Sequence, residues 1–365
     1  MLAPGGAQEE RRKKVAPGDR GLARCGLRFP RPRRDRYAFV WEGVRGAMRP
    51  LTVGCLGNLD YARELGKKST ESDVQLASFK EGDVLVSMVL PLRYPEKPAA
   101  LAYTVNSSDA GLLVVDALTK EVGESILAAD AAGLAQGVIV LRNFLQPEQL
   151  APLLKNTALE KWHLTTDAQQ PAVRTKLAEF PARAVEGPVR VPVDHHFDVK
   201  GIGTVALGFV TQGVVKRHET YRVYPTKKTA QVRSIQVHDE DVDSAPVGDH
   251  VGLALKGIAN DDIDRGHVLA PEGTLEARAE KDTVKLQVTC SKFFKPGINN
   301  DAVLYLAVGW QFCPLRVKYG QVVPGASGSI DALLQKPLAF EKGQRGVLFS
   351  LDATQRVVGP AVVEG

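Results

Sequence analysis

The hydrophobic pattern of this chain changes once, near residue 183, and that change constrains the fold more than any other feature. Before it, short apolar runs such as "DVLVSMVLPL" and "AGLLVVDAL" alternate with segments such as "ESILAADAAGLA" that place apolar residues at helical spacing. After it the helical signal stops, and short runs rich in Val, Thr and Tyr are separated by glycine-bearing turns. The first pattern predicts a parallel sheet covered on both faces by helices. The second predicts antiparallel barrels or sandwiches.

The chain has 365 residues, which is enough for two or three domains of about 100–200 residues each. We predict a multidomain α/β plus all-β protein, with an α/β domain at 48–182 and two antiparallel β-barrels at 183–271 and 272–365. No apolar run approaches the roughly 18–20 residues that cross a bilayer, and no apolar signal segment follows the charged start. We therefore expect a cytoplasmic protein with no membrane partner.

The start of the chain is a separate, strongly basic segment. Residues 1–48 carry twelve Lys or Arg and five Asp or Glu, a net charge of +7, whereas the whole chain carries +5. Residues 1–47 have no helical or strand periodicity and are interrupted by Gly and Pro, which predicts disorder. Two interpretations stay open: an arm that binds RNA phosphates, or a mis-assigned extension ahead of a true start at Met48.

Cysteine and histidine spacing does not favour a metal site. The four cysteines, at positions 25, 55, 290 and 313, are far apart and form no C-x-x-C, so we expect buried or incidental thiols rather than zinc ligands or disulfides. We interpret the acidic run "HDEDVD" at 238–243 as a solvated turn, and His195-His196 as the start of a strand. No metal is expected.

A stretch of some eighty residues carries a specific set of turn motifs. These are Lys200-Gly201-x-Gly203-Thr204-Val205, Arg233-Ser234-Ile235-Gln236, Gly248-Asp249-x-Val251-Gly252 and Leu255-Lys256-Gly257. In this order they resemble the second domain of translational GTPases, above all elongation factor Tu and archaeal selenocysteine-specific elongation factors. A tight barrel hairpin requires positive φ at Gly201 and Gly203. The resemblance implies a GTPase domain before this barrel and an elongation factor domain 3-like barrel after it.

The nucleotide motifs of that implied GTPase domain are altered. The family's phosphate loop resembles Gly-His-Val-Asp-His-Gly-Lys-Thr, and here "GCLGNLDYA" runs parallel to it with Gly57, Asn58 and Asp60 before a helix-like "RELGKKSTESDV". Eight residues separate Gly57 from Gly66, where a Walker loop requires four. Without the loop's lysine and hydroxyl, the β- and γ-phosphates lose their main charge partners.

Two further motifs are replaced. The region of the family's Asp-x-Pro-Gly-His reads "MVLPLRYPEK", and no histidine precedes His163 to orient an attacking water. Arg142-Asn143-Phe144-Leu145 stands in place of the guanine-reading Asn-Lys-x-Asp, and Leu145 cannot accept the N–H bonds of guanine. We therefore predict a degenerate P-loop GTPase-type domain with no catalytic residue and no cofactor, in which Gly57, Asn58 and Asp60 are the remnant of the nucleotide site.

The predicted function is that of an elongation factor-like protein, not an enzyme, that binds tRNA, the ribosome or another translation factor, and no DNA. Without GTP the switch has no energy source, so we predict a rigid arrangement of the three domains. The resemblance places Lys256 near a tRNA acceptor end; a solvated lysine is the alternative. Two other functions stay open: an active selenocysteine-type elongation factor with a rearranged phosphate loop, requiring GTP and magnesium, and a protein–protein adaptor.

Overall fold

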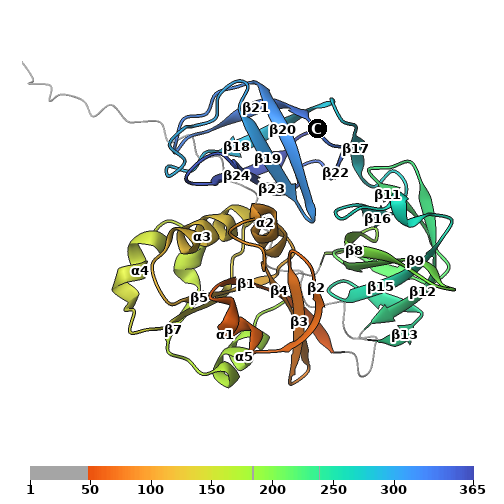
Figure 1. Ribbon diagram of the computed structural model, residues 1–365, viewed down its shortest axis with the longest axis horizontal. Coiled ribbons are helices and arrows are strands. Elements are labelled where there is room, and N and C mark those ends of the chain that lie inside the picture. Colours follow the sequence, from red (N-terminus) through yellow and green to blue (C-terminus); the bar gives the residue numbers. More distant parts are fainter. Residues whose placement is uncertain (1–47, 183–184, 238) are drawn as a thin grey trace, which may run out of the picture. The chain divides into compact units, whose positions relative to one another are not determined.

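The computed structural model describes residues 48–182, 185–237 and 239–365. It contains a helix-covered sheet followed by two closed six-stranded antiparallel barrels, all within one compact unit of the chain (Figure 1). This confirms the predicted fold class. The predictions for residues 1–47, including Cys25, and for His238 lie outside the described residues.

The α/β domain is built on a seven-stranded sheet. Its strands, in spatial order, are β2 (Lys67–Glu71), β3 (Gln75–Glu81), β4 (Val84–Leu90), β1 (Arg49–Gly57), β5 (Ala110–Val115), β6 (Gly137–Leu141) and β7 (His163–Thr166). Pairing is parallel from β4 to β7, as predicted. The prediction of a wholly parallel sheet is wrong at β2 and β3, which are antiparallel. Only two residues join β3 to β4, and so short a connection permits only a hairpin.

The segment predicted as helix-like after the remnant loop is also different. Helix α1 (Leu59–Arg63) is only five residues long, and Lys67–Glu71 then form strand β2. Ser69 and Thr70 are weak helix formers. A Cβ on Gly66 would lie 2.7 Å from the carbonyl oxygen of Ser78, so this glycine allows the chain to pass close to β3.

Helices cover both faces of the sheet, as predicted. Helices α1 and α5 (Gln170–Ala178) share an apolar core with one face. Helices α2 (Pro98–Asn106), α3 (Lys120–Ala132) and α4 (Pro147–Leu154) and the 3₁₀ turn η1 (Ala158–Lys161) pack on the other. Helix α3 begins where the Thr119 hydroxyl accepts a bond from the Val122 N–H and ends at Gly133, whose φ is 81°.

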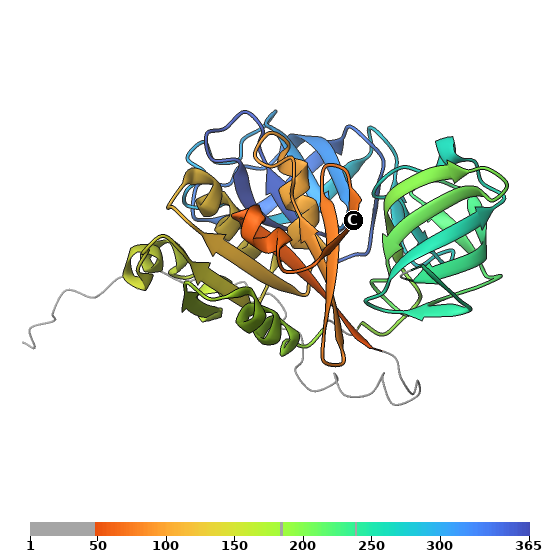
Figure 2. The same cartoon turned by 60° about the horizontal axis from the view of Figure 1, so that its bottom comes forward.

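The first barrel closes in the order β11 (Thr220–Tyr224), β16 (Val268–Ala270), β8 (Val191–Val199), β9 (Gly203–Phe209), β15 (His250–Lys256) and β12 (Thr229–Val237). Figure 2 shows these strands wrapping around a closed interior. Gly201 and Gly203 have φ of 84° and 96°, which confirms the predicted tight hairpin. Glu240–Val242, expected in a solvated turn, instead form the short strand β13 paired with β12. The remaining short elements are β10 (Val214–Lys216), β14 (Ser244–Pro246) and η2 (Asn260–Asp262).

The second barrel closes in the order β18 (Thr283–Thr289), β21 (Ser327–Leu334), β20 (Gln311–Tyr319), β19 (Val303–Val308), β23 (Arg345–Phe349) and β24 (Val357–Val363). Strands β17 (Glu276–Arg278) and β22 (Leu338–Phe340) form a separate pair. Ala307, Val347, Phe349 and Val357 of this barrel belong to the same buried apolar cluster as α2 and α3. The α/β domain and the second barrel therefore share a continuous core.

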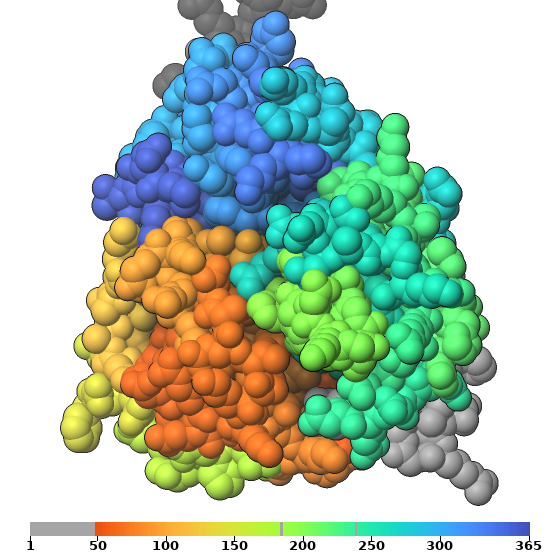
Figure 3. Space-filling model, turned by 45° about the vertical axis from the view of Figure 1, so that its right-hand side comes forward, coloured from red at the N-terminus to blue at the C-terminus, as the bar shows by residue number. Residues whose placement is uncertain are grey.

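Figure 3 shows the surfaces of the three domains in contact on one face. In the described part of the chain, no helix is long and apolar enough to cross a membrane.

Candidate functional site

The junction of β1 and α1 occupies the place where the family resemblance puts the phosphate loop. Gly57 ends β1 with φ of 78°, and a Cβ there would lie 2.0 Å from the carbonyl oxygen of Val114. Asn58 alone separates strand from helix, and its backbone N–H donates to that same carbonyl at 2.9 Å. Its side-chain oxygen accepts bonds from the N–H groups of Asp60 (2.9 Å) and Tyr61 (3.2 Å). The first helical amides are thus already capped by the protein itself.

A polar network bridges the carboxyl ends of the neighbouring strands. The Asn58 amide nitrogen donates to the carboxylate of Asp116, the residue that follows β5. Arg142, which follows β6, forms an ion pair with Asp116 at 3.7 Å and lies over the Tyr61 ring, 5.3 Å from its centroid. The Tyr61 hydroxyl donates to the Ala168 carbonyl oxygen at 2.6 Å. Ligands of parallel α/β sheets bind at this edge, and here the chain's own side chains occupy it.

The turn after β6 does not present a base-reading carboxylate. Asn143 and Phe144 both have positive φ, and Phe144 is 91% exposed, whereas Leu145 packs against the apolar core. The Asn143 amide donates to the Asp116 carbonyl oxygen at 3.4 Å. The carboxylate that contacts this turn, Asp116, is already engaged by Asn58 and Arg142.

A cavity of about 210 Å³ lies beside the β1–α1 junction. Its lining residues are Gly57, Leu59, Pro91, Tyr94, Pro95, Glu121 and Ser125, none of which is basic. Hydrogen bonds from the backbone N–H of Glu121 and from Thr119 hold the pKa of Glu121 below its usual range, so its carboxylate is ionised at neutral pH. This hollow therefore carries negative charge where a phosphate-binding site requires positive charge.

The segment after β4 is tied to other parts of the chain. The Tyr94 hydroxyl donates to Glu124 of α3 at 2.7 Å, and Arg356 of the second barrel donates to the Pro95 carbonyl oxygen at 2.6 Å. This is the segment that stands in place of the family's Asp-x-Pro-Gly-His motif. Here the segment is anchored by protein contacts.

Glu124 and Arg356 join the α/β domain to the second barrel. The Glu124 side chain is 1% exposed and that of Arg356 is 13% exposed. The guanidinium donates from Nη2 at 2.6 Å and from Nε at 3.1 and 3.2 Å, and the Arg356 backbone N–H donates at 2.8 Å. Burial alone raises the pKa of Glu124, but the bonds from Arg356 and Tyr94 outweigh it and hold that pKa below its usual range. We call this pair and Tyr94 the interdomain clamp.

Arg265 links the α/β domain to the first barrel. Its guanidinium donates to the Asp194 carbonyl oxygen at 2.8 Å within the barrel and to the Ser72 hydroxyl at 2.9 Å across the interface. It also pairs with Asp73 at 3.4 Å. The interdomain contact was missed because its partners lie almost two hundred residues away in the chain.

The predicted site residues lie in two separate places in the structure. Gly57, Asn58 and Asp60 meet at the β1–α1 junction, whereas Lys256 is exposed at the end of β15, in the first barrel. Cys55, Cys290 and Cys313 are buried free thiols, as predicted, and burial raises the pKa of Cys55 to about 12. Within the described ranges, no group of three or more His, Cys, Asp or Glu side chains gathers in a way that could hold a metal ion.

Comparisons with known proteins agree with this architecture. The family model for elongation factor Tu domain 2 matches residues 203–270. Uncharacterized protein MJ0325 of Methanocaldococcus jannaschii is 34% identical over 314 residues, covering 86% of this chain and 99% of that protein. The selenocysteine-specific elongation factor of the same organism is 25% identical over 304 residues, covering 77% of this chain and 64% of that protein. The chain belongs to the same family as MJ0325. The other matches support a place for that family in the translational GTPase superfamily.

Solved structures of that superfamily share the fold. Translation elongation factor SelB from Methanococcus maripaludis, in complex with a GTP analogue, aligns with a TM-score of 0.74 at 22% identity, covering 87% of this chain and 79% of that one. A bacterial selenocysteine-specific elongation factor aligns with a TM-score of 0.73 at 17% identity, covering 87% of this chain and 58% of that one. The predicted resemblance to elongation factor Tu and selenocysteine-specific elongation factors is thus confirmed, in sequence by the domain 2 match and in fold by these structures.

Proposed function

We propose that this translational GTPase-superfamily member is an elongation factor-like protein that has lost GTP binding and hydrolysis and that contacts tRNA, the ribosome or another translation factor. The observation that carries the proposal is the single-residue connection between β1 and α1. A phosphate loop works because an arc of consecutive backbone N–H groups wraps the phosphate while a lysine neutralises its charge. A connection of one residue provides neither the arc nor the lysine.

Electrostatics at the junction support the same conclusion. The cavity beside Gly57 is lined by the ionised Glu121 and by no basic residue. Two like unit charges about 4 Å apart near a protein surface repel by roughly 4 kcal/mol. The phosphates of GTP therefore do not fit the residues at this site, and the mechanism we propose has no hydrolytic step.

The interdomain contacts support a fixed arrangement in place of a nucleotide switch. In switching GTPases, the γ-phosphate and magnesium order the loops that control domain contacts. Here the segment after β4 is held by Glu124 and Arg356, and Arg265 holds the loop between β2 and β3. These contacts all join protein groups to one another, so we expect the domains to keep one arrangement with and without GTP.

The barrels are the surfaces that we expect to contact a translation component. The first barrel matches the elongation factor Tu domain 2 model, and the match includes Lys256. Lys256 is exposed at the end of β15, where it pairs with Gln231 of β12, and its ammonium group can reach a phosphate. One of the two relatives from M. jannaschii, at 25% identity, is by name a selenocysteine-specific elongation factor. A tRNA contact through this barrel is the most specific form of the proposal.

The test is equilibrium binding of the full chain to labelled aminoacyl-tRNA and to ribosomes, with and without GTP and magnesium. We expect association with at least one of them at an affinity that GTP does not change. Binding that appears only with GTP would contradict the proposal and favour an active factor with a rearranged loop. Absence of binding to both would favour the protein–protein adaptor.

A further inference from the structure

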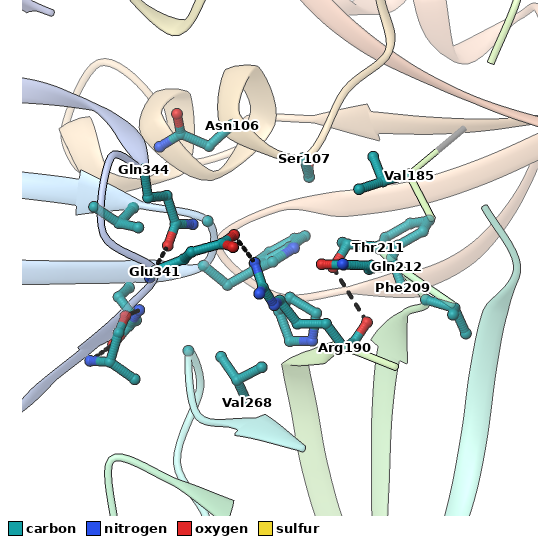
Figure 4. Close-up of a pocket in the computed structure, with 18 of the residues that line it drawn as sticks. Asn106, Ser107, Val185, Arg190, Phe209, Thr211, Gln212, Val268, Glu341 and Gln344 are labelled. Atoms are coloured by element: carbon teal, nitrogen blue, oxygen red, sulfur yellow. Dashed lines mark hydrogen bonds and ion pairs between the residues drawn. The ribbon is translucent and has the colours of Figure 1, made fainter. Parts of the chain in front are cut away.

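A second cavity, of about 280 Å³, lies where the three domains meet (Figure 4). The α/β domain contributes Asn106 and Ser107 from the end of α2. The first barrel contributes Arg190 and Phe209, and the second contributes Trp310 from the β19–β20 turn. This cavity is separate from the β1–α1 junction, and the inference drawn from it does not rest on the proposed function.

Two buried hydrogen-bond donors that line this cavity have no partner. Trp310 is 2% exposed, and neither its indole N–H nor the side-chain N–H₂ of Asn106 has an acceptor. Among the described residues only five buried side-chain N or O atoms lack a hydrogen-bond partner, and two of them are here. A buried donor without an acceptor is destabilising, and in a native structure it calls for an explanation.

The Trp310 ring is fixed in its orientation. It stacks on Tyr103 of the α/β domain with ring centroids 5.3 Å apart, and on Phe209 of the first barrel with centroids 6.4 Å apart. Turning the indole to reach a protein acceptor would break both stacks. The indole N–H therefore belongs to a ring that is held in place and that lines the cavity.

The cavity also offers positive charge and an apolar wall. The guanidinium of Arg190 pairs with Glu341 at 3.1 Å, and the two meet in the middle of the view in Figure 4. Arg190 is 15% exposed but Glu341 is 57% exposed, so the glutamate can be displaced to solvent while the arginine stays. Phe209 and Val268 supply apolar surface nearby.

We propose that this cavity binds a small organic carboxylate with an apolar body. Its oxygens accept bonds from Asn106 and Trp310, and its charge is matched by Arg190. A volume of about 280 Å³ is just below the range of roughly 300–1,000 Å³ for drug-sized ligands and is almost twice that of a cavity that holds benzene. Because all three domains line the cavity, a bound carboxylate would stabilise their arrangement.

The test uses three probes on the full chain: phenylacetate, its neutral amide phenylacetamide, and phenyl phosphate, each measured by ligand-observed NMR and calorimetry. We expect phenylacetate to bind with a dissociation constant of about 1 mM or lower and phenylacetamide to bind at least tenfold more weakly. Phenyl phosphate binding in preference to phenylacetate would contradict the carboxylate assignment. No binding of phenylacetate at about 5 mM would overturn the proposal.

Two variants test the donors. Trp310→Phe removes the indole N–H but keeps an aromatic ring against Tyr103 and Phe209, and Asn106→Ala removes the amide. Each should weaken phenylacetate binding roughly tenfold or more. Asn299→Ala is the matched control, since that amide donates to the Pro296 carbonyl oxygen in the second barrel and should not affect binding. Unchanged phenylacetate affinity in both Trp310→Phe and Asn106→Ala would refute the site.

Discussion

The substitution Glu124→Gln tests whether the interdomain clamp holds the α/β domain to the second barrel. Glu124 accepts four bonds from Arg356 and one from Tyr94, and both side chains of the ion pair are almost fully buried. Replacing one partner leaves the other charge buried and unmatched, which costs about 3–5 kcal/mol in other proteins. Arg356 keeps its bond to Pro95, so we expect a value near 3 kcal/mol.

The assay is the free energy of unfolding from urea titration, with small-angle scattering to follow the separation of the domains. Asp60→Asn is the control, because the Asp60–Arg63 pair is exposed and its loss should cost less than about 1 kcal/mol. The double variant Glu124→Gln/Arg356→Met should recover part of the loss, since it removes the unmatched charge. A loss below about 1 kcal/mol in Glu124→Gln, with unchanged scattering, would refute the clamp.

The clamp also predicts a pH dependence. The folded-state pKa of Glu124 lies below its ordinary value of 4.5, so the folded protein binds this proton less readily than the unfolded chain does. The contribution of Glu124 is therefore complete above the unfolded pKa and is lost as pH falls through the folded pKa. The stability difference between the native chain and Glu124→Gln should shrink as pH is lowered below about 4.5. A difference that grows in acid would show that the sign is wrong.

Three further substitutions test the β1–α1 junction and the first barrel. Gly57→Ala should cost roughly 3 kcal/mol or more in unfolding free energy, because φ of 78° is strained for alanine and the added Cβ meets the Val114 carbonyl oxygen. A loss under about 1 kcal/mol would show that Gly57 does not approach Val114 this closely. Asn58→Ala removes the helix cap and the bond to Asp116, so we expect a loss of about 2 kcal/mol in unfolding free energy. If this variant changed the affinity for GTP, the proposal that the site no longer binds nucleotide would be contradicted. Lys256→Glu should weaken tRNA binding and reduce by about one the slope of log affinity against log salt concentration, without changing the melting temperature. Lys216 is also exposed on this barrel and provides the control, because Lys216→Glu should leave tRNA binding unchanged. Equal effects of the two lysine variants would identify Lys256 as a solvated lysine.

The fold was predictable where local pattern and topology agree. Buried runs such as Ala110–Val115 are too apolar for any place but the interior of a sheet, and the turn glycines at 201 and 203 mark one hairpin of the first barrel. Strand β2 was missed because "KKSTE" is exposed, short and without alternation; it is a strand only because β3 lies beside it. Pairing of this kind is a tertiary effect that a local pattern does not contain.

The site was predictable in part. The missing lysine and the replaced guanine motif are visible in the sequence, because each depends on residue type at a fixed spacing. The network of Asn58, Asp116 and Arg142 was not, since it joins residues that are far apart in the chain and meet only at the sheet edge. The clamp left one signal, a glutamate on the apolar face of α3, but its partner Arg356 lies 232 residues further on.

The central claim is that this protein no longer binds or hydrolyses GTP. It is tested most directly by titrating the full chain into a fluorescent GTP analogue with magnesium and following phosphate release. Translation elongation factor SelB from M. maripaludis, whose crystal structure holds a GTP analogue, is the positive control. We predict no saturable binding up to about 1 mM and no phosphate release above background. Saturation in the micromolar range, with turnover, would contradict the account.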